Sequence, residues 1–218
     1  MKKAAVILCG CGAMDGSEIH EATFALLALN EENIEYQCFA LDKPQTKVVN
    51  FTNGQELPES RNQLLESSRI SRGKIDNIKN LEVSNFDYLV LPGGFGAAYN
   101  LCNFAEEKAN ASVDTEIERV IKDFHKEQKP IGAICISPVI VGLVLGRTTN
   151  PLLTAGDEGH PVEDELKKLG CKTQSCETID CVIDQQNKIV STPAYMNAKE
   201  IKDVREGIKK LTLAMKSL

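Results

Sequence analysis

Short apolar runs that end in glycine-rich turns alternate along this chain with segments whose apolar residues recur every three or four positions. AAVIL (4–8), YLVLPGG (88–94) and KPIGAIC (129–135) are runs of the first kind. Such runs are typical of strands covered on both faces, whereas the longer spacing is typical of amphipathic helices. The alternation predicts an α/β fold, a three-layer sandwich with helices on both faces of a mostly parallel central sheet.

The remaining elements can be placed by residue range. The spacing of apolar residues predicts helices over 17–29, 59–70, 114–128, 138–146, 161–169 and 201–215. Further strands are expected at 35–40 and 152–156, and CVIDQQNKIVSTPA (181–194) is typical of a hairpin. Ser17 is expected to cap the first helix, and Pro138 takes a first-turn position, where a missing N–H costs nothing.

One segment, residues 43–58, interrupts the alternation. It contains an Asn-Gly pair flanked by β-forming residues, which predicts a small β-hairpin inserted into the fold. The pattern leaves open whether this insertion caps a site or serves a subunit interface. Because no internal repeat or linker-like stretch occurs, we expect a single domain over 1–218.

Composition excludes several classes of protein. The chain has 218 residues, 42% of them hydrophobic, which is enough to bury a substantial core. A formal net charge of −6 argues against a nucleic-acid partner, and no apolar run is long enough to predict a membrane span. The start, MKKAAVILCGCGAMDG, does not resemble a secretory signal. These features favour a cytoplasmic protein.

The eight cysteines fall mostly within apolar, strand-like segments, which favours reduced thiols over a disulfide framework. Cys9 and Cys11 form a CxC pair that could bind a metal or undergo redox cycling. A tetrahedral metal site needs further ligands at compatible spacing, and neither CxxC nor HExxH accompanies the pair. We therefore expect structural thiols there, and no metal or other cofactor.

Cys135 stands at a junction where an apolar run meets the start of a helix. In open parallel sheets ligands bind beyond the carboxyl ends of the strands, so AICISP (133–138), CGCGAMDGSEIHE (9–21) and LPGGFGA (91–97) should share one pocket. The turn should expose the thiol, and the helix N–H groups should lower its pKa. Cys135 is therefore a candidate nucleophile, although a buried structural cysteine fits the six residues of AICISP equally well.

Glycines and carboxyl groups at the other two junctions favour the interpretation of Cys135 as a nucleophile. Gly93 and Gly94 allow a sharp turn close to a ligand, so the N–H of Gly94 can join that of Ile136 as an oxyanion hole. Glu18 and Glu21 lie near a helix start, and we choose Glu21 as the partner of the thiol. A carboxyl beside a thiolate is pushed towards its protonated form and can relay a proton.

The histidines do not complete a predicted triad. Ile136, and not a histidine, directly follows the cysteine. His160 is followed by Pro161, Val162 and Glu163 and is distant from Cys135 in the sequence. His20 should point away from the site and His125 should be solvated, so assistance to Cys135 by a histidine stays undecided.

Five motifs in order along nearly the whole chain carry a resemblance to a known family. They resemble the enhancing-lycopene-biosynthesis (sigma cross-reacting) family, within the ThiJ/PfpI, class I glutamine amidotransferase-like superfamily: DGSEIHEA, ESRNQLLESSRISRGKI, LPGGFGAAYNL, AICISP and STPAYM. The resemblance implies a flavodoxin-like fold, a nucleophile at Cys135 and a carboxyl partner at Glu21. It also implies a homodimer and a link to isoprenoid biosynthesis.

The same resemblance implies glutathione-independent glyoxalase activity on small dicarbonyls, without an external cofactor. Glyoxal would give glycolate and methylglyoxal would give lactate. We expect a small pocket roofed by Phe95 and the 97–104 segment, which would favour the smaller substrate. The alternative is a protein without turnover, in which Cys135 senses oxidants or the crevice binds a metabolite or partner.

Overall fold

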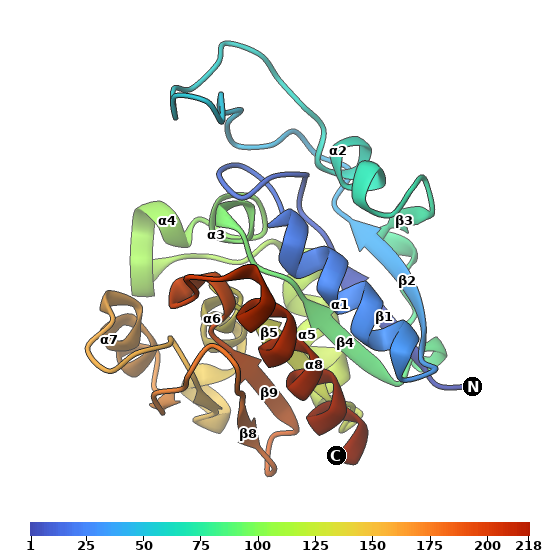
Figure 1. Ribbon diagram of the computed structural model, residues 1–218, viewed down its shortest axis with the longest axis vertical. Helices are drawn as coiled ribbons and strands as arrows, with labels where there is room; N and C mark the ends of the chain where they lie inside the picture. The colour runs from blue at the N-terminus through green and yellow to red at the C-terminus, as the bar shows by residue number, and fades with distance from the viewer.

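The computed structural model describes residues 1–218, and the strands form one seven-stranded sheet in the order β3-β2-β1-β4-β5-β9-β8 (Figure 1). All neighbouring pairs in it are parallel except β8 and β9, which pair antiparallel. The strands are β1 (Lys3–Ile7), β2 (Glu35–Ala40), β3 (Ile75–Asn77), β4 (Tyr88–Leu91), β5 (Ile131–Ile134), β8 (Val182–Asp184) and β9 (Ile189–Thr192). A small separate ladder joins β6 (Leu152–Leu153) to β7 (Lys172–Thr173).

Helices cover both faces of the sheet, as predicted. They are α1 (Ile19–Glu31), α2 (Gln63–Ile70), α3 (Phe95–Asn100), α4 (Phe104–Glu107), α5 (Thr115–Lys126), α6 (Pro138–Thr149), α7 (Pro161–Lys168) and α8 (Ile201–Ser217). Short 3-10 helices span Ile78–Asn80, Val83–Asn85, Lys108–Asn110 and Ala194–Met196. The result is the α/β, flavodoxin-like three-layer sandwich that the sequence predicted.

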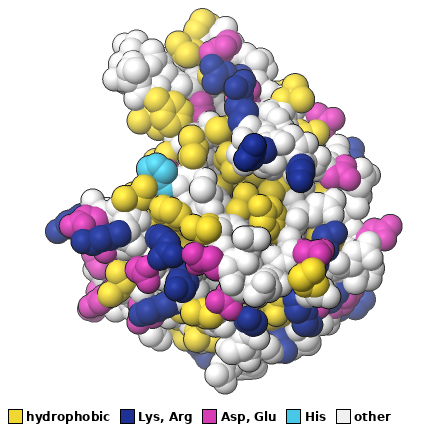
Figure 2. Space-filling view, turned by 45° about the vertical axis from the view of Figure 1, so that its right-hand side comes forward, with side chains coloured by type: hydrophobic (Ala, Val, Ile, Leu, Met, Phe, Trp, Pro, Cys, Tyr) yellow, Lys and Arg dark blue, Asp and Glu magenta, His cyan; other side chains and the backbone are white.

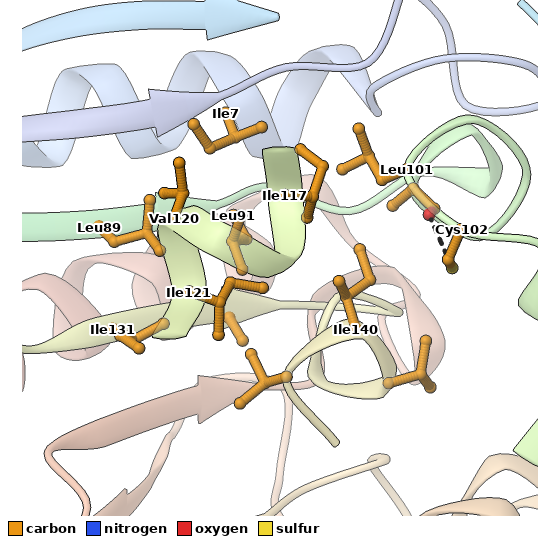
Figure 3. Packing of buried hydrophobic residues seen from close by; sticks show 14 of the residues in the cluster. Ile7, Leu89, Leu91, Leu101, Cys102, Ile117, Val120, Ile121, Ile131 and Ile140 are labelled. Carbon is orange, nitrogen blue, oxygen red and sulfur yellow. Dashed lines mark hydrogen bonds between the residues drawn. The ribbon is translucent and has the colours of Figure 1, made fainter. Parts of the chain in front are cut away.

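Two apolar clusters, one on each face of the sheet, form the core. The cluster under α5 and α6 contains 32 buried residues, and Figure 3 shows Ile117, Val120 and Ile121 packed against strand residues such as Leu89. The cluster under α1 and α8 contains 20. Successive residues of β1 alternate between them, because side chains of a strand point to opposite faces.

The first helix begins later than the sequence predicted. It starts at Ile19, and its cap is Glu18, whose Oε2 accepts a hydrogen bond from the N–H of Glu21 at 2.7 Å. Ser17 does not cap this helix, because its hydroxyl accepts from the N–H of Cys9 at 2.9 Å instead. The prediction of a Ser17 cap is therefore wrong. The loop after β1 uses that hydroxyl to satisfy its own backbone.

The insertion is not a regular hairpin. Residues 43–58 form isolated antiparallel bridges, Val49 with Glu56 and Pro44 with Asn62, but no strand ladder. The segment projects from the body as a lobe above α2 (Figure 1) and is attached through Asp15, whose Oδ2 accepts from the N–H of Val49 at 2.8 Å. The cross-strand hydrogen bonds that the Asn-Gly pattern predicted are limited to those from Asn50 to Gln55 and from Leu57 to Val48, both 2.8 Å, and the buried Asp15 side chain adds an anchor.

Candidate active site

Cys135 occupies a strained turn between β5 and α6. Its φ of 60° lies in the left-handed region that non-glycine residues rarely adopt. Two contacts hold the turn: the N–H of Cys135 donates to the carbonyl of Thr192 at 2.9 Å, and the hydroxyl of Ser137 donates to the carbonyl of Pro92 at 2.7 Å. The strand-to-helix turn predicted from AICISP is present, and its geometry is that of a nucleophile elbow.

Two backbone N–H groups point at the thiol. Those of Gly94 and Ile136 lower the pKa of the Cys135 thiol, and neither donates to a backbone oxygen elsewhere in the protein. Gly94 has a φ of 99°, and a Cβ there would lie 2.4 Å from the backbone of the loop before α1. Only glycine therefore allows this approach, and the structure places both predicted oxyanion donors beside Cys135.

Glu21 lies beneath the thiol and has no solvent exposure. Its Oε2 accepts from the N–H of Gly93 at 3.0 Å, and its Oε1 accepts from the N–H of Tyr195 at 3.3 Å. The carboxyl is also close enough to Cys135 for each group to shift the pKa of the other. The structure thus brings together the cysteine and the carboxyl group chosen from the sequence, with Gly93 packed between them.

Burial governs the protonation of this pair. Burial, followed by the carboxyl of Glu18, raises the pKa of Glu21 from 4.5 to about 8. Burial and the carboxyl of Glu21 also raise the pKa of the Cys135 thiol well above its ordinary value, against the lowering effect of the two N–H groups. The sequence-based prediction of a lowered thiol pKa is wrong, because it counted the helix start but not the burial.

The thiol opens into a pocket of about 350 Å³. Its lining comes from the loop after β1, the start of α3, the elbow, the start of α7 and the segment after β9: Ala13, Glu18, Gly94, Phe95, Cys135, Ile136, His160, Val162, Tyr195 and Met196. Glu18 and Phe95 are thus pocket residues, as predicted. The 97–104 segment does not line the pocket, and neither does any part of the insertion. The prediction of a small pocket under that segment is wrong.

Five lining residues were missed by sequence reasoning: Ala13, His160, Val162, Tyr195 and Met196. His160 caps α7 through Nδ1, which accepts from the N–H of Val162 at 3.2 Å, so the neutral ring carries its hydrogen on Nε2. The hydroxyl of Tyr195 lies 2.7 Å from Nδ1 of His20, so His20 reaches the rim of the pocket instead of pointing away. A histidine directly before a proline at a helix start was the available signal for His160.

The other thiols are less suited to chemistry. Cys9 is buried, and burial raises its pKa to about 12. Cys11 is partly exposed but does not line the pocket. No group of three or more His, Cys, Asp or Glu side chains is arranged to hold a metal ion. All the helices are too short or too polar to cross a lipid bilayer.

A doubly wound sheet with a cysteine elbow facing a buried carboxyl defines this chain as a class I glutamine amidotransferase-like protein. More narrowly, it belongs to the DJ-1/PfpI family, whose model matches residues 3–185.

Relatives support this assignment over most of the chain. It is 42% identical over 212 residues to the human mitochondrial glutamine amidotransferase-like class 1 domain-containing protein 3, covering 94% of this chain and 79% of that protein. It is 41% identical to a mitochondrial ES1 protein homolog of Rattus norvegicus, covering 94% and 80%.

Solved structures share the fold. An isoprenoid biosynthesis protein with an amidotransferase-like domain from Ehrlichia chaffeensis has a TM-score of 0.92 at 38% identity, covering 99% of both chains. The rapid encystment protein of Francisella tularensis has a TM-score of 0.63 at 14% identity, covering 99% of both chains, and shows the fold alone.

Proposed function

We propose that this protein is a glutathione-independent glyoxalase-type enzyme that converts small dicarbonyls, such as glyoxal, into hydroxy acids, such as glycolate, through Cys135. The observation that carries the proposal is the pairing of the Cys135 thiol with the buried Glu21 carboxyl, beneath two free N–H groups. The reaction is an internal oxidation and reduction, so it needs a nucleophile, an oxyanion site and a proton relay but no external electron carrier.

In its reactive form the pair holds one proton. The sulfur of Cys135 adds to the aldehyde carbon, and the N–H groups of Gly94 and Ile136 hold the developing oxyanion. The shared proton moves to that oxygen, which leaves Glu21 as a carboxylate. Glu21 then takes the proton from the sulfur-bearing carbon and returns it to the neighbouring carbon, while the hydroxyl proton on the first carbon passes to the oxygen of the second. The first carbon is thereby oxidised to a thioester and the second is reduced to an alcohol.

Water then attacks the thioester, the carbon–sulfur bond breaks, and the hydroxy acid leaves. The raised pKa of Glu21, about 8, suits a group that must both donate and accept a proton near neutral pH. His160 is placed at the same pocket and can polarise the water or the second carbonyl.

The finer family assignment belongs to this proposal as well. The motifs resemble the enhancing-lycopene-biosynthesis family, and the similar Ehrlichia protein bears a name that refers to isoprenoid biosynthesis. We therefore propose an association with isoprenoid metabolism.

A cytoplasmic location and a homodimer also stay proposals. A monomer in sedimentation at micromolar concentration would contradict the dimer.

The alternative without turnover is an oxidant-sensing or metabolite-binding protein that uses the same cysteine. Peroxide reacts with thiolates, and the raised pKa of Cys135 lowers the thiolate fraction near neutral pH. This observation disfavours the sensor and favours a thiol that becomes ionised only as a substrate binds.

Glycolate production from glyoxal, measured without glutathione, tests the proposal. The purified protein should turn over, Cys135→Ala should be inactive, and Glu21→Gln should lose at least about 100-fold in kcat/KM because the proton relay is gone. Cys11→Ala is the matched control, since Cys11 is another partly exposed thiol on a loop after a strand. Equal activity in wild type and Cys135→Ala would refute the proposal.

A further inference from the structure

The pocket around Cys135 is far larger than glyoxal. Its volume of about 350 Å³ is roughly that of twelve water molecules at about 30 Å³ each. Seven of its ten lining residues are hydrophobic, among them Phe95, Ile136, Val162 and Met196. The space beside the thiol is therefore built to hold an apolar group in addition to the reacting carbonyls.

The lining contains no lysine or arginine, and its acidic side chain is Glu18. Oε2 of Glu18 is occupied as the cap of α1, but Oε1 makes no hydrogen bond within the protein; Nδ1 of His20 lies 3.9 Å from it. A carboxylate or phosphate on the ligand would face this oxygen without an arginine or lysine to balance it.

His160 is the histidine of the lining, and it offers a single donor, Nε2, because its Nδ1 is engaged by the N–H of Val162. His20 lies outside the lining, and its Nδ1 is engaged by the hydroxyl of Tyr195 at 2.7 Å. Figure 2 shows hydrophobic side chains gathered on a hollowed face of the molecule below the projecting lobe, with a histidine at the edge of the hollow. The pocket is thus apolar, with one carboxylate oxygen free.

From the size, the apolar wall and the free oxygen of Glu18, we infer that the natural substrate is an uncharged 2-oxoaldehyde with a bulky apolar or aromatic substituent, and that Glu18 excludes anionic analogues. The assignment of a 2-oxoaldehyde as the reacting group rests on the proposed function. The selectivity of the pocket for uncharged apolar ligands stands without it. Glu18 is a specificity-determining residue here, because its free oxygen faces the ligand.

Alkylation of Cys135 measures this selectivity without requiring turnover. The probes are iodoacetamide, the anion iodoacetate and N-phenyl iodoacetamide, and each rate is divided by the rate of the same probe with free N-acetylcysteine. We expect the phenyl probe to react about tenfold faster than iodoacetamide after this correction, because the pocket buries its ring. Iodoacetate should react slower than iodoacetamide by about fivefold or more.

Two variants with matched controls assign the effects. Glu18→Gln keeps an oxygen to cap α1 but removes the charge, so the discrimination against iodoacetate should largely disappear. Glu35→Gln, an exposed carboxyl at the start of β2, should leave it unchanged. Phe95→Ala should reduce the preference for the phenyl probe, whereas Leu65→Ala, which removes an exposed apolar side chain outside the pocket, should not.

The outcomes separate the two proposals. Corrected rates that are equal for all three probes, or fastest for iodoacetate, would overturn the inferred selectivity even if glyoxal is turned over. Selective labelling with no turnover of glyoxal, methylglyoxal or phenylglyoxal would refute the glyoxalase proposal and leave the uncharged apolar ligand class standing. If both proposals hold, kcat/KM should be higher for phenylglyoxal than for glyoxal. It should be lower for the para-carboxylate derivative of phenylglyoxal than for phenylglyoxal itself.

Discussion

The carboxyl of Glu21 lies beside Cys135, raises the pKa of its thiol and has no contact with solvent. Both carboxyl oxygens also accept from backbone N–H groups, those of Gly93 and Tyr195. The acid cannot swing away from the cysteine without leaving buried donors unsatisfied, which is costly. Its position is therefore fixed by the backbone of two loops, and its protonation is coupled to that of the thiol.

This coupling predicts how the thiol responds to a change at Glu21. Cys135 should be the first thiol labelled by limiting iodoacetamide, ahead of Cys11 and the buried Cys9. Glu21→Gln should raise the labelling rate of Cys135 at neutral pH, because the carboxyl that raises the thiol pKa is gone. Mass-spectrometric mapping at early times measures both, with Glu35→Gln as the control. Prior labelling of Cys11 and an unchanged rate in Glu21→Gln would show that the pair is wrongly assigned.

The buried acid also predicts a pH dependence of stability. The pKa of Glu21 rises from 4.5 to about 8 on folding, so between these values the folded protein holds a proton that the unfolded chain has released. The contribution of this group is present in full below pH 4.5 and is lost as the pH rises through about 8. Relative to Glu21→Gln, the free energy of unfolding of the wild type should fall by roughly 2–5 kcal/mol across that window.

Urea titrations at the two ends of the window check this prediction. The Gln variant is expected to be the less stable protein at the acid end, because its amide cannot accept from both backbone N–H groups. The prediction concerns how the difference in free energy of unfolding between the two proteins changes with pH, not its absolute size. A difference that is constant between the two pH values would mean that Glu21 is ionised throughout.

The absence of a side chain at Gly93 lets the side chains of Cys135 and Glu21 come close together. A Cβ at this position would lie 2.5 Å from the Cβ of Cys135 and 2.6 Å from Oε2 of Glu21. Gly93→Ala should therefore destabilise the protein by about 3 kcal/mol and abolish activity, because the site is overpacked. Gly73→Ala is the control: it meets no neighbouring atom, so only its positive φ of 81° costs energy, about 1 kcal/mol. Full activity in Gly93→Ala would contradict the packing described here.

His160 has two roles that substitution can separate. His160→Asn retains a side-chain acceptor for the start of α7, so the free energy of unfolding should stay near that of the wild type, whereas His160→Ala should lose about 1 kcal/mol. Both variants should lose at least about tenfold in kcat/KM if the ring assists Cys135. Thermal unfolding and glycolate assays on the same samples distinguish a helix cap from a catalytic group. Unchanged kinetics in both would leave His160 as a cap only.

The strands and helices that carry the site were predictable because their signals are local. A continuous apolar run, a three-to-four spacing and a Pro-Gly-Gly turn each act over a few residues, and they located β1, β4, β5, α5 and α8 within a few positions. The carboxyl-edge rule for parallel sheets then placed Cys135, Glu21 and Gly94 at one site, since it depends only on strand direction. The sequence by itself therefore determined the fold class and the grouping of these residues.

The protonation of the site and the shape of its pocket were decided only by the tertiary structure. The pKa of Cys135 depends on how much protein surrounds it, and that burial comes from Gly93, Glu21 and segments distant in sequence. His160 and Met196 reach the pocket through the paths of loops after β6 and β9, which no local pattern specifies. Burial and cavity shape sum contributions from the whole chain, whereas helix and strand signals are short-range, and this difference sets what a sequence alone can determine.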